Sequence, residues 1–286
     1  MPDPARALMS GHAAVGWGGV HTLTEAVRVT IGVDLTGVLR PVRAGNAFEE
    51  TVERLLTVIK LGLVAPGERL PPERELAAQL GISRLTLRDA IRELQRAGYV
   101  EPRRGRFGGT FITYTRPEPS AGEVERLAAQ NGEKLTDALN FRYAVETGAA
   151  DVLAQRLAPG GVAEGPRYRP PEADGHAARP QDVLRARLAE VNGASPQDYR
   201  RLDTLFHLAI AELTGSNLLA TSCAEARMRL NDLLNAIPVL KPNIAHAASQ
   251  HVAIVDAILA GDAEAARRAV AEHLAGTGAL LRGFLG

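Results

Sequence analysis

The chain has 286 residues, of which 45% are hydrophobic and 4% aromatic, and its 33 basic and 33 acidic side chains give a formal net charge of zero. This length allows two domains with separate cores, and the single cysteine, Cys223, excludes an intrachain disulfide. No apolar run approaches the roughly 20 residues of a membrane span and no signal-peptide pattern opens the chain, so we expect a soluble, cytoplasmic protein.

Residues 1–46 are rich in glycine, alanine and valine and lack a clear periodicity. We expect them to form a poorly ordered N-terminal extension. From Ala47 apolar side chains recur at helical spacing as far as Ile59, and Gly62 ends this first helix.

Two further short helices follow the first. The run Leu70-Pro71-Pro72-Glu73 opens the second helix, because proline suits the first helical positions, and Gly81 ends it. Ser83 is a suitable N-cap for the third helix, which ends at Gly98. The apolar faces of these two helices carry Leu76, Ala77, Leu80, Leu87, Ala90, Ile91 and Leu94.

A β-hairpin is predicted after the third helix. Tyr99-Val100 and the run 110–114 are prone to form strands, and they flank a glycine-rich, basic tip at 103–109. Three short helices and a hairpin predict a winged helix-turn-helix over residues 47–114. The tight turn Gly81-Ile82 makes the third helix the one that reads DNA.

The charge distribution supports binding to double-stranded DNA. Residues 82–106 contain seven arginines and three acidic residues, a local net charge of +4 in a neutral chain. The face of the third helix opposite its apolar residues carries Arg84, Thr86, Arg88 and Arg92. A solvated helix face with intrahelical ion pairs is the alternative, but it explains poorly why so few acidic residues occur there.

The C-terminal part is predicted to be all-helical. Two prolines in 115–121 mark a linker, and residues 122–286 then form one domain. A proline- and glycine-rich stretch at 158–180 is expected to be a loop insertion. The expected helices are 122–131, 134–157, 181–192, 196–214, 216–236, 242–260 and 262–284. The predicted fold class is therefore mainly α, with a winged helix-turn-helix followed by an all-α bundle.

Four residues of this helical part suit a divalent metal. Asp203 and His207 are one helical turn apart and face the same way, while His251 and His273 lie on later helices. One carboxylate and three imidazoles are a sensible ligand set for a metal with open positions. Each histidine taken alone is more often a packed or surface residue than a metal ligand.

The N-terminal pattern resembles the GntR family of bacterial regulators. The resemblance rests on Leu70–Ala77, on Gly81–Ala90, on Leu94 and on Gly98-Tyr99-Val100, and it covers about residues 47–114. It implies that DNA is contacted by Arg74, Ser83, Arg84, Thr86, Arg88 and the wing residue Gly105. In the wing, which is more basic than short family versions, we expect Arg104 to contact the DNA backbone.

Residues 122–285 resemble the all-helical effector domain of FadR-type GntR regulators. The resemblance rests on Asp203-x-x-x-His207, Gly215-Ser216-Asn217, His251 before Gly261–Ala266, His273-Leu274, and Arg142 with Glu146. It implies that Asp203, His207, His251 and His273 bind a metal, zinc first with nickel or manganese as alternatives. The metal in turn helps to hold a small carboxylate effector.

Two further residues have alternative roles at this stage. Arg142 either binds the effector carboxylate as a bidentate partner or forms an (i, i+4) ion pair with Glu146. Asn217 either orients a ligand or caps a helix.

The combined reading is a homodimeric transcription regulator, expected to be a repressor that the effector releases from operator DNA. One alternative is a regulator whose metal is purely structural. Another is a metal-dependent enzyme fused to a DNA-binding module, but neither His-Glu-x-x-His nor Gly-x-Ser-x-Gly occurs in the sequence. We therefore expect no enzymatic activity.

Overall fold

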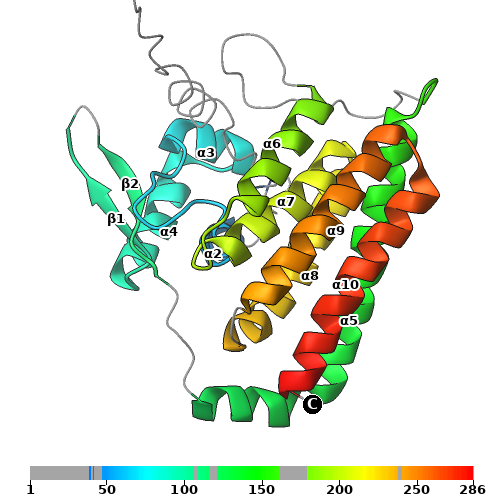
Figure 1. The fold of residues 1–286 in the computed structure, drawn as a ribbon. Helices are drawn as coiled ribbons and strands as arrows, with labels where there is room; N and C mark the ends of the chain where they lie inside the picture. The colour runs from blue at the N-terminus through cyan, green and yellow to red at the C-terminus, as the bar shows by residue number, and fades with distance from the viewer. Residues whose placement is uncertain are drawn as a thin grey trace, which may run out of the picture. The chain divides into compact units, whose positions relative to one another are not determined.

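The computed structural model describes residues 39, 41, 47–105, 108–115, 121–161, 179–237 and 240–285 (Figure 1). The predicted N-terminal extension, most of the 115–121 linker and most of the 158–180 loop lie outside the described residues, as do two residues of the wing tip.

The first described part is a winged helix-turn-helix, as predicted. It consists of α2 (Ala47–Lys60), α3 (Glu73–Leu80), α4 (Arg84–Arg96), β1 (Val100–Arg103) and β2 (Gly109–Ile112). Helix α4 packs against α2, α3 and β1. The apolar faces of the helices meet in a small core in which Leu55, Leu76, Leu80, Leu87 and Leu94 are at most 2% exposed.

The turn between α3 and α4 is short because each helix end is closed locally. Gly81 adopts a left-handed conformation, with φ of +64°, which ends α3. The Ser83 side chain then accepts a hydrogen bond from the backbone N–H of Thr86 at 3.0 Å and begins α4.

The wing is a two-stranded antiparallel hairpin. One residue of the segment between α2 and α3 also pairs with it. Strands β1 and β2 pair from Val100 with Ile112 to Arg103 with Gly109, and Arg69 adds an isolated bridge to Phe111. A side chain at Gly109 would collide with the aliphatic part of Arg69. Glycine at this position therefore lets the Arg69 side chain lie against the hairpin.

The second described part is all-helical. It contains α5 (Ala121–Leu157), α6 (Pro180–Asn192), α7 (Tyr199–Leu213), α8 (Asn217–Ala236), α9 (Lys241–Ala260) and α10 (Ala263–Leu285). The prediction of two helices over 122–157 was wrong, because the 37 residues of α5 continue through Asn131 and Gly132. A glycine inside a helix costs only about 1 kcal/mol relative to alanine, too little to break a helix about 55 Å long that packs against four others.

Helix α7 lies in the interior of this second part. Helices α5, α9 and α10 run side by side (Figure 1), and α7 packs against α5, α6 and α8. All eight residues from Thr204 to Ala211 are buried, so α7 has no solvent-facing side over this stretch. Polar side chains on α7 must therefore find their partners inside the protein.

No helix among the described residues is both long and apolar enough to cross a membrane.

Candidate functional site

The exposed face of α4 begins with two arginines that share one carboxylate. Arg88 Nε lies 2.7 Å from Glu73 Oε2, and Arg84 Nη2 lies 3.9 Å from the same oxygen. The two arginine side chains are 55% and 59% exposed. Ion pairs as exposed as these contribute at most about 1 kcal/mol, so either guanidinium can exchange Glu73 for a phosphate or a base edge at little cost.

Two hydroxyl residues lie at the start of the same helix. Ser83 Oγ is 2.9 Å from Thr86 Oγ1 and also caps the backbone N–H of Thr86. Ser83 is exposed and Thr86 is partly exposed. The hydrogen bonds between these two residues fix the end of α4 that carries Arg84. Backbone N–H groups at a helix N-terminus also favour phosphate.

The remaining predicted DNA-binding residues lie on α3 and on the wing. Arg74 is the second residue of α3, and Arg104 and Gly105 lie at the wing tip; all three are exposed. Within the described part of the chain, neither Arg74 nor Arg104 forms an ion pair with an acidic residue. By contrast, three other arginines of this domain are paired with near neighbours: Arg92 with Asp89, Arg96 with Glu93, and Arg103 with Glu101.

Arg69 contacts the wing, a role that was not predicted from the sequence. Its Nη1 atom donates a hydrogen bond to the carbonyl oxygen of Gly108 at 3.2 Å. Arg69 precedes α3, and nothing in its local pattern connects it with a hairpin about forty residues later.

The four predicted metal ligands come together inside the helical part. Asp203 and His207 come from α7, His251 from α9 and His273 from α10, and one donor atom from each lies within 4.8 Å of all the others. Asp203 Oδ1 lies 3.3 Å from His251 Nε2, 3.8 Å from His207 Nε2 and 4.0 Å from His273 Nε2. The three imidazole rings therefore present the same nitrogen atom to one carboxylate oxygen.

Outer hydrogen bonds orient two of the three rings. His207 Nδ1 lies 2.9 Å from Glu146 Oε2, and His273 Nδ1 lies 3.1 Å from Gln250 Oε1. Both acceptors draw the ring proton to Nδ1, which leaves the Nε2 lone pair facing the cluster. Carboxylate and amide oxygens behind histidine ligands are the usual arrangement around protein metals.

Glu146 connects the cluster to two buried arginines. Its carboxylate accepts hydrogen bonds from Arg142 Nε at 2.9 Å and from Arg227 Nε and Nη2 at 2.9 and 3.2 Å. The third Arg227 nitrogen, Nη1, donates to Asp203 Oδ2 at 3.0 Å. Arg227 therefore holds the Asp203 carboxylate from one side and leaves Oδ1 to the histidines.

The protonation states of these groups suit metal binding. Burial raises the pKa of Glu146, but Arg142, Arg227 and His207 outweigh burial and hold this pKa well below its usual value. Burial likewise raises the pKa of Asp203, and Arg227 with His207 reverses the shift. Burial together with Arg227 lowers the pKa of His207 to about 4, against the opposing carboxylates. Ionised carboxylates and neutral imidazoles are the forms that metals bind.

The residues present fit a divalent ion by two observations. An ion held at about 2.0–2.2 Å from each ligand keeps its ligand atoms roughly 3–4 Å apart. The three distances from Asp203 Oδ1 to the histidine nitrogens, from 3.3 to 4.0 Å, fall in that range, and all four donor atoms lie within 4.8 Å of one another. In addition, both ring nitrogens of His251 are buried without a hydrogen-bond partner. A buried imidazole that leaves both nitrogens unsatisfied is costly, and an ion at Nε2 would satisfy one of them.

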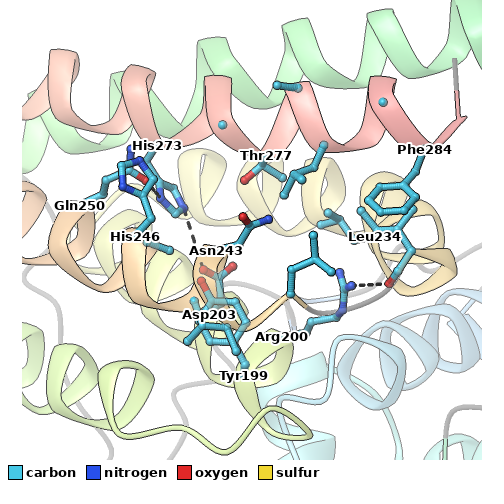
Figure 2. A pocket seen from close by; sticks show the side chains of 18 of the residues that line it. Tyr199, Arg200, Asp203, Leu234, Asn243, His246, Gln250, His273, Thr277 and Phe284 are labelled. Carbon is cyan, nitrogen blue, oxygen red and sulfur yellow. Dashed lines mark hydrogen bonds and ion pairs between the residues drawn. The ribbon is translucent and has the colours of Figure 1, made fainter.

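The cluster opens into a cavity of about 500 Å³. Figure 2 shows Asp203, His273 and Gln250 at one end of this cavity, and Leu234 and Phe284 at the other. Arg142 also lines the cavity, and its Nη1 atom is buried without a hydrogen-bond partner. The cavity thus offers a carboxylate both the ligand cluster and an unsatisfied guanidinium.

The structure shows what Arg142 and Asn217, the two residues with alternative roles, contact. Arg142 forms the (i, i+4) pair with Glu146 through Nε and still has Nη1 to offer. Asn217 is exposed at the first position of α8 and does not line the cavity. The cap of α8 is Ser216, whose side chain accepts from Leu219 N at 3.3 Å. Asn217 is therefore withdrawn as an effector-binding residue.

Several residues of the site were not found from the sequence. Arg227 and Gln250 were overlooked, because neither lies in a motif with the ligands. His246 is five residues before His251 and faces another side of α9, yet the cavity extends to that side and His246 lines it.

Helix α4 is an arginine-rich recognition helix of a winged helix-turn-helix, and the helical part that follows has a ligand-sized cavity. Together these features define a DNA-binding transcription regulator. Comparison with protein families agrees with this class. The family described as "Bacterial regulatory proteins, gntR family" matches residues 48–112, and the FCD domain matches residues 173–276. The chain belongs to the GntR family and carries an FCD effector-binding domain.

The similar proteins are regulators, not enzymes. One from Escherichia coli (strain K12), named "Putative L-lactate dehydrogenase operon regulatory protein", is 31% identical over 241 residues, which cover 79% of this chain and 83% of the relative. The Escherichia coli HTH-type transcriptional repressor NanR is 28% identical over 276 residues, or 91% and 93% of the two chains. The solved structure of E. coli McbR/YncC aligns with a TM-score of 0.45 at 19% identity, over 83% of this chain and 98% of that one.

Proposed function

We propose that this protein is a repressor whose binding to operator DNA is controlled by a small carboxylic acid, held with a divalent metal ion. Asp203, His207, His251 and His273 would bind the ion, and Arg142 would bind the carboxylate. One observation carries the proposal: the converging ligand atoms and the unpartnered Arg142 Nη1 lie on the same cavity. Zinc suits three nitrogen donors and one oxygen donor, with nickel and manganese as alternatives.

The charges around the cluster favour an anionic ligand. Arg142 and Arg227 balance Glu146 and Asp203, so these four groups carry no net charge before an ion binds. A divalent ion would add two positive charges in a buried place, where uncompensated charge is costly. A carboxylate would offset part of this charge and would also accept a hydrogen bond from Arg142 Nη1.

Control of DNA binding would require a dimer. A two-fold symmetric protein presents two reading helices to successive major grooves about 34 Å apart. A coupling of about 1–3 kcal/mol between effector and DNA changes operator occupancy severalfold to a hundredfold. A relative covering most of this chain is named a transcriptional repressor, which supports the repressor role.

The test is the melting temperature of the full chain, measured as purified, after chelation, and after zinc, nickel or manganese is restored. We expect chelation to lower it and at least one carboxylic acid to raise it only when metal is present. The variant His273→Ala should lose both the metal and the response. His246→Ala, also a histidine lining the cavity but not a ligand, should keep the metal.

Two other results would contradict parts of this proposal. If chelation destabilises the protein and no acid has an effect, the metal is structural. If chelation and His273→Ala both leave the melting temperature unchanged, the four residues do not hold a metal.

A further inference from the structure

The cavity has two chemically different ends. At one end lie Asp203, His273, Gln250 and the unsatisfied Arg142. Leu234 and Phe284 lie at the other end (Figure 2). The further large apolar side chains that line the cavity come from the segment after α8, from α9 and from α10: Ile237, Leu240, Ile244 and Leu280. A ligand filling this space meets charge at one end and hydrocarbon at the other.

Helix α10 forms the wall that connects the two ends. His273, Thr277, Leu280 and Phe284 follow at spacings of four, three and four residues, which places them on one face of the helix. Eleven residues of helix correspond to about 16 Å. The wall is therefore much longer than a carboxylate with one or two carbon atoms attached.

Helix α9 repeats the same gradient on its own wall. Gln250 contacts His273 at the polar end. Toward the start of α9 the apolar residues Ala247, Ile244 and Leu240 follow, with Asn243 as one polar residue among them. Because α9 and α10 are consecutive helices that return through Gly261 and pack together, the start of α9 and the end of α10 lie at the same end of the pair. Both walls thus change from polar to apolar in the same direction.

The size of the cavity also exceeds what a very small acid needs. A hydroxy acid with six heavy atoms occupies roughly 180 Å³ if each atom takes up the volume of a water molecule, about 30 Å³. The cavity of about 500 Å³ lies in the range of drug-sized ligands. A short acid would leave the apolar end filled with water.

We propose that the effector is an amphipathic monocarboxylic acid, with an alkyl or aryl body that extends from the metal cluster along α10 to Phe284. This inference rests on the proposed metal-and-carboxylate function and specifies its ligand. One other cation, Arg200, lines the cavity, but its Nη2 already donates to the carbonyl oxygen of Ile237 at 2.6 Å. A second carboxylate on the ligand would therefore gain little there and would lose the apolar contacts.

Two glycines that line the cavity allow its apolar end to be filled by substitution. Gly276 and Gly283 line the cavity, and a Cβ atom added to either one meets no other atom within 4 Å. Leucine forms helices better than glycine, so Gly283→Leu should fold while its side chain occupies the apolar end. Ala275→Leu places the same side chain at an exposed position of α10 that does not line the cavity, and it serves as the matched control.

The experiment is calorimetric titration of the zinc-loaded full chain with lactate, hexanoate, octanoate, phenylpropionate and suberate. Each methylene group that becomes buried contributes about fourfold in affinity, so octanoate should bind at least tenfold more tightly than hexanoate. Suberate, which has the same carbon number as octanoate and a second carboxylate, should bind more weakly. Gly283→Leu should weaken octanoate about tenfold and leave lactate within twofold, whereas Ala275→Leu should change neither.

Each other result has a definite meaning. If lactate binds as tightly as octanoate, or suberate binds more tightly, the apolar-body inference is wrong while the metal-and-carboxylate function stands. Equal octanoate affinity in Gly283→Leu and the parent protein would also overturn the inference. If no acid binds the zinc-loaded protein, the proposed function itself fails.

Discussion

The Nε2 atoms of His207 and His273 lie 3.2 Å apart, while the Nδ1 atom of each ring faces an oxygen acceptor of its own. With the protons held at Nδ1, both facing nitrogens carry lone pairs, so they repel each other unless a cation lies near both. The two acceptors, Glu146 and Gln250, would therefore influence the affinity for the proposed metal ion without touching it.

The first prediction concerns Gln250, the acceptor that is only partly buried. Gln250→Ala should weaken metal binding about 10- to 100-fold, the usual effect of removing an outer partner of a histidine ligand. Gln250→Glu keeps an acceptor and should retain the affinity. Competition with a metal-sensitive dye measures both, and Ser249→Ala, an exposed neighbour, is the control. Unchanged affinity in Gln250→Ala would mean that this hydrogen bond does not orient His273.

The second prediction concerns Arg227, which is 2% exposed and joins Glu146 to Asp203. Arg227→Met leaves two buried carboxylates without their shared partner and should cost about 3–5 kcal/mol in the free energy of unfolding. Arg227→Lys keeps the charge but not the planar fork, and should cost less. Urea denaturation measures the difference.

A matched control for Arg227 lies two residues further along α8. Arg229 forms an exposed (i, i+4) pair with Glu225, so Arg229→Met should change stability by at most about 1 kcal/mol. If Arg227→Met and Arg229→Met cost the same, the buried network does not support this part of the fold.

Residues of the site that share one helix could be predicted from the sequence. Contacts between different helices could not. Asp203 and His207 share a helix face, so their spacing alone placed them together. His251 and His273 were linked to them only through the family resemblance, because no local pattern relates three different helices. Arg227 reaches Glu146 across 81 residues, and nothing in either segment indicates that contact. Asn217 shows the opposite case, in which a motif residue lies outside the cavity.

The third prediction separates base reading from phosphate contact. Arg84→Ala should reduce the preference for the selected operator over random DNA by about tenfold to a hundredfold, because a bidentate base contact contributes about 1–3 kcal/mol of discrimination. Arg104→Ala should weaken binding to the operator and to random DNA equally. It should also reduce the slope of log binding constant against log salt concentration by about one. Fluorescence anisotropy at several salt concentrations, on an operator selected from genomic fragments, measures both. Equal losses on both DNAs in Arg84→Ala would remove its base-reading role.

The last prediction uses Glu73, the acidic residue that faces both Arg84 and Arg88 of α4. Its carboxylate holds Arg88 at 2.7 Å and faces Arg84 at 3.9 Å, so it competes with DNA for both. Glu73→Gln removes one negative charge from the proposed DNA surface and should strengthen binding to any DNA severalfold, with a larger gain at low salt because such exposed interactions are screened.

The control for Glu73 is Glu93→Gln. Glu93 pairs with Arg96 at the last turn of α4, at the opposite end of the helix from Arg84, so its removal should change DNA affinity less. If both variants strengthen binding equally, the effect is one of net charge alone. Weaker binding in Glu73→Gln would instead mean that Glu73 positions Arg88 for its DNA contact, since freeing the guanidinium would then cost more in lost orientation than it gains in charge.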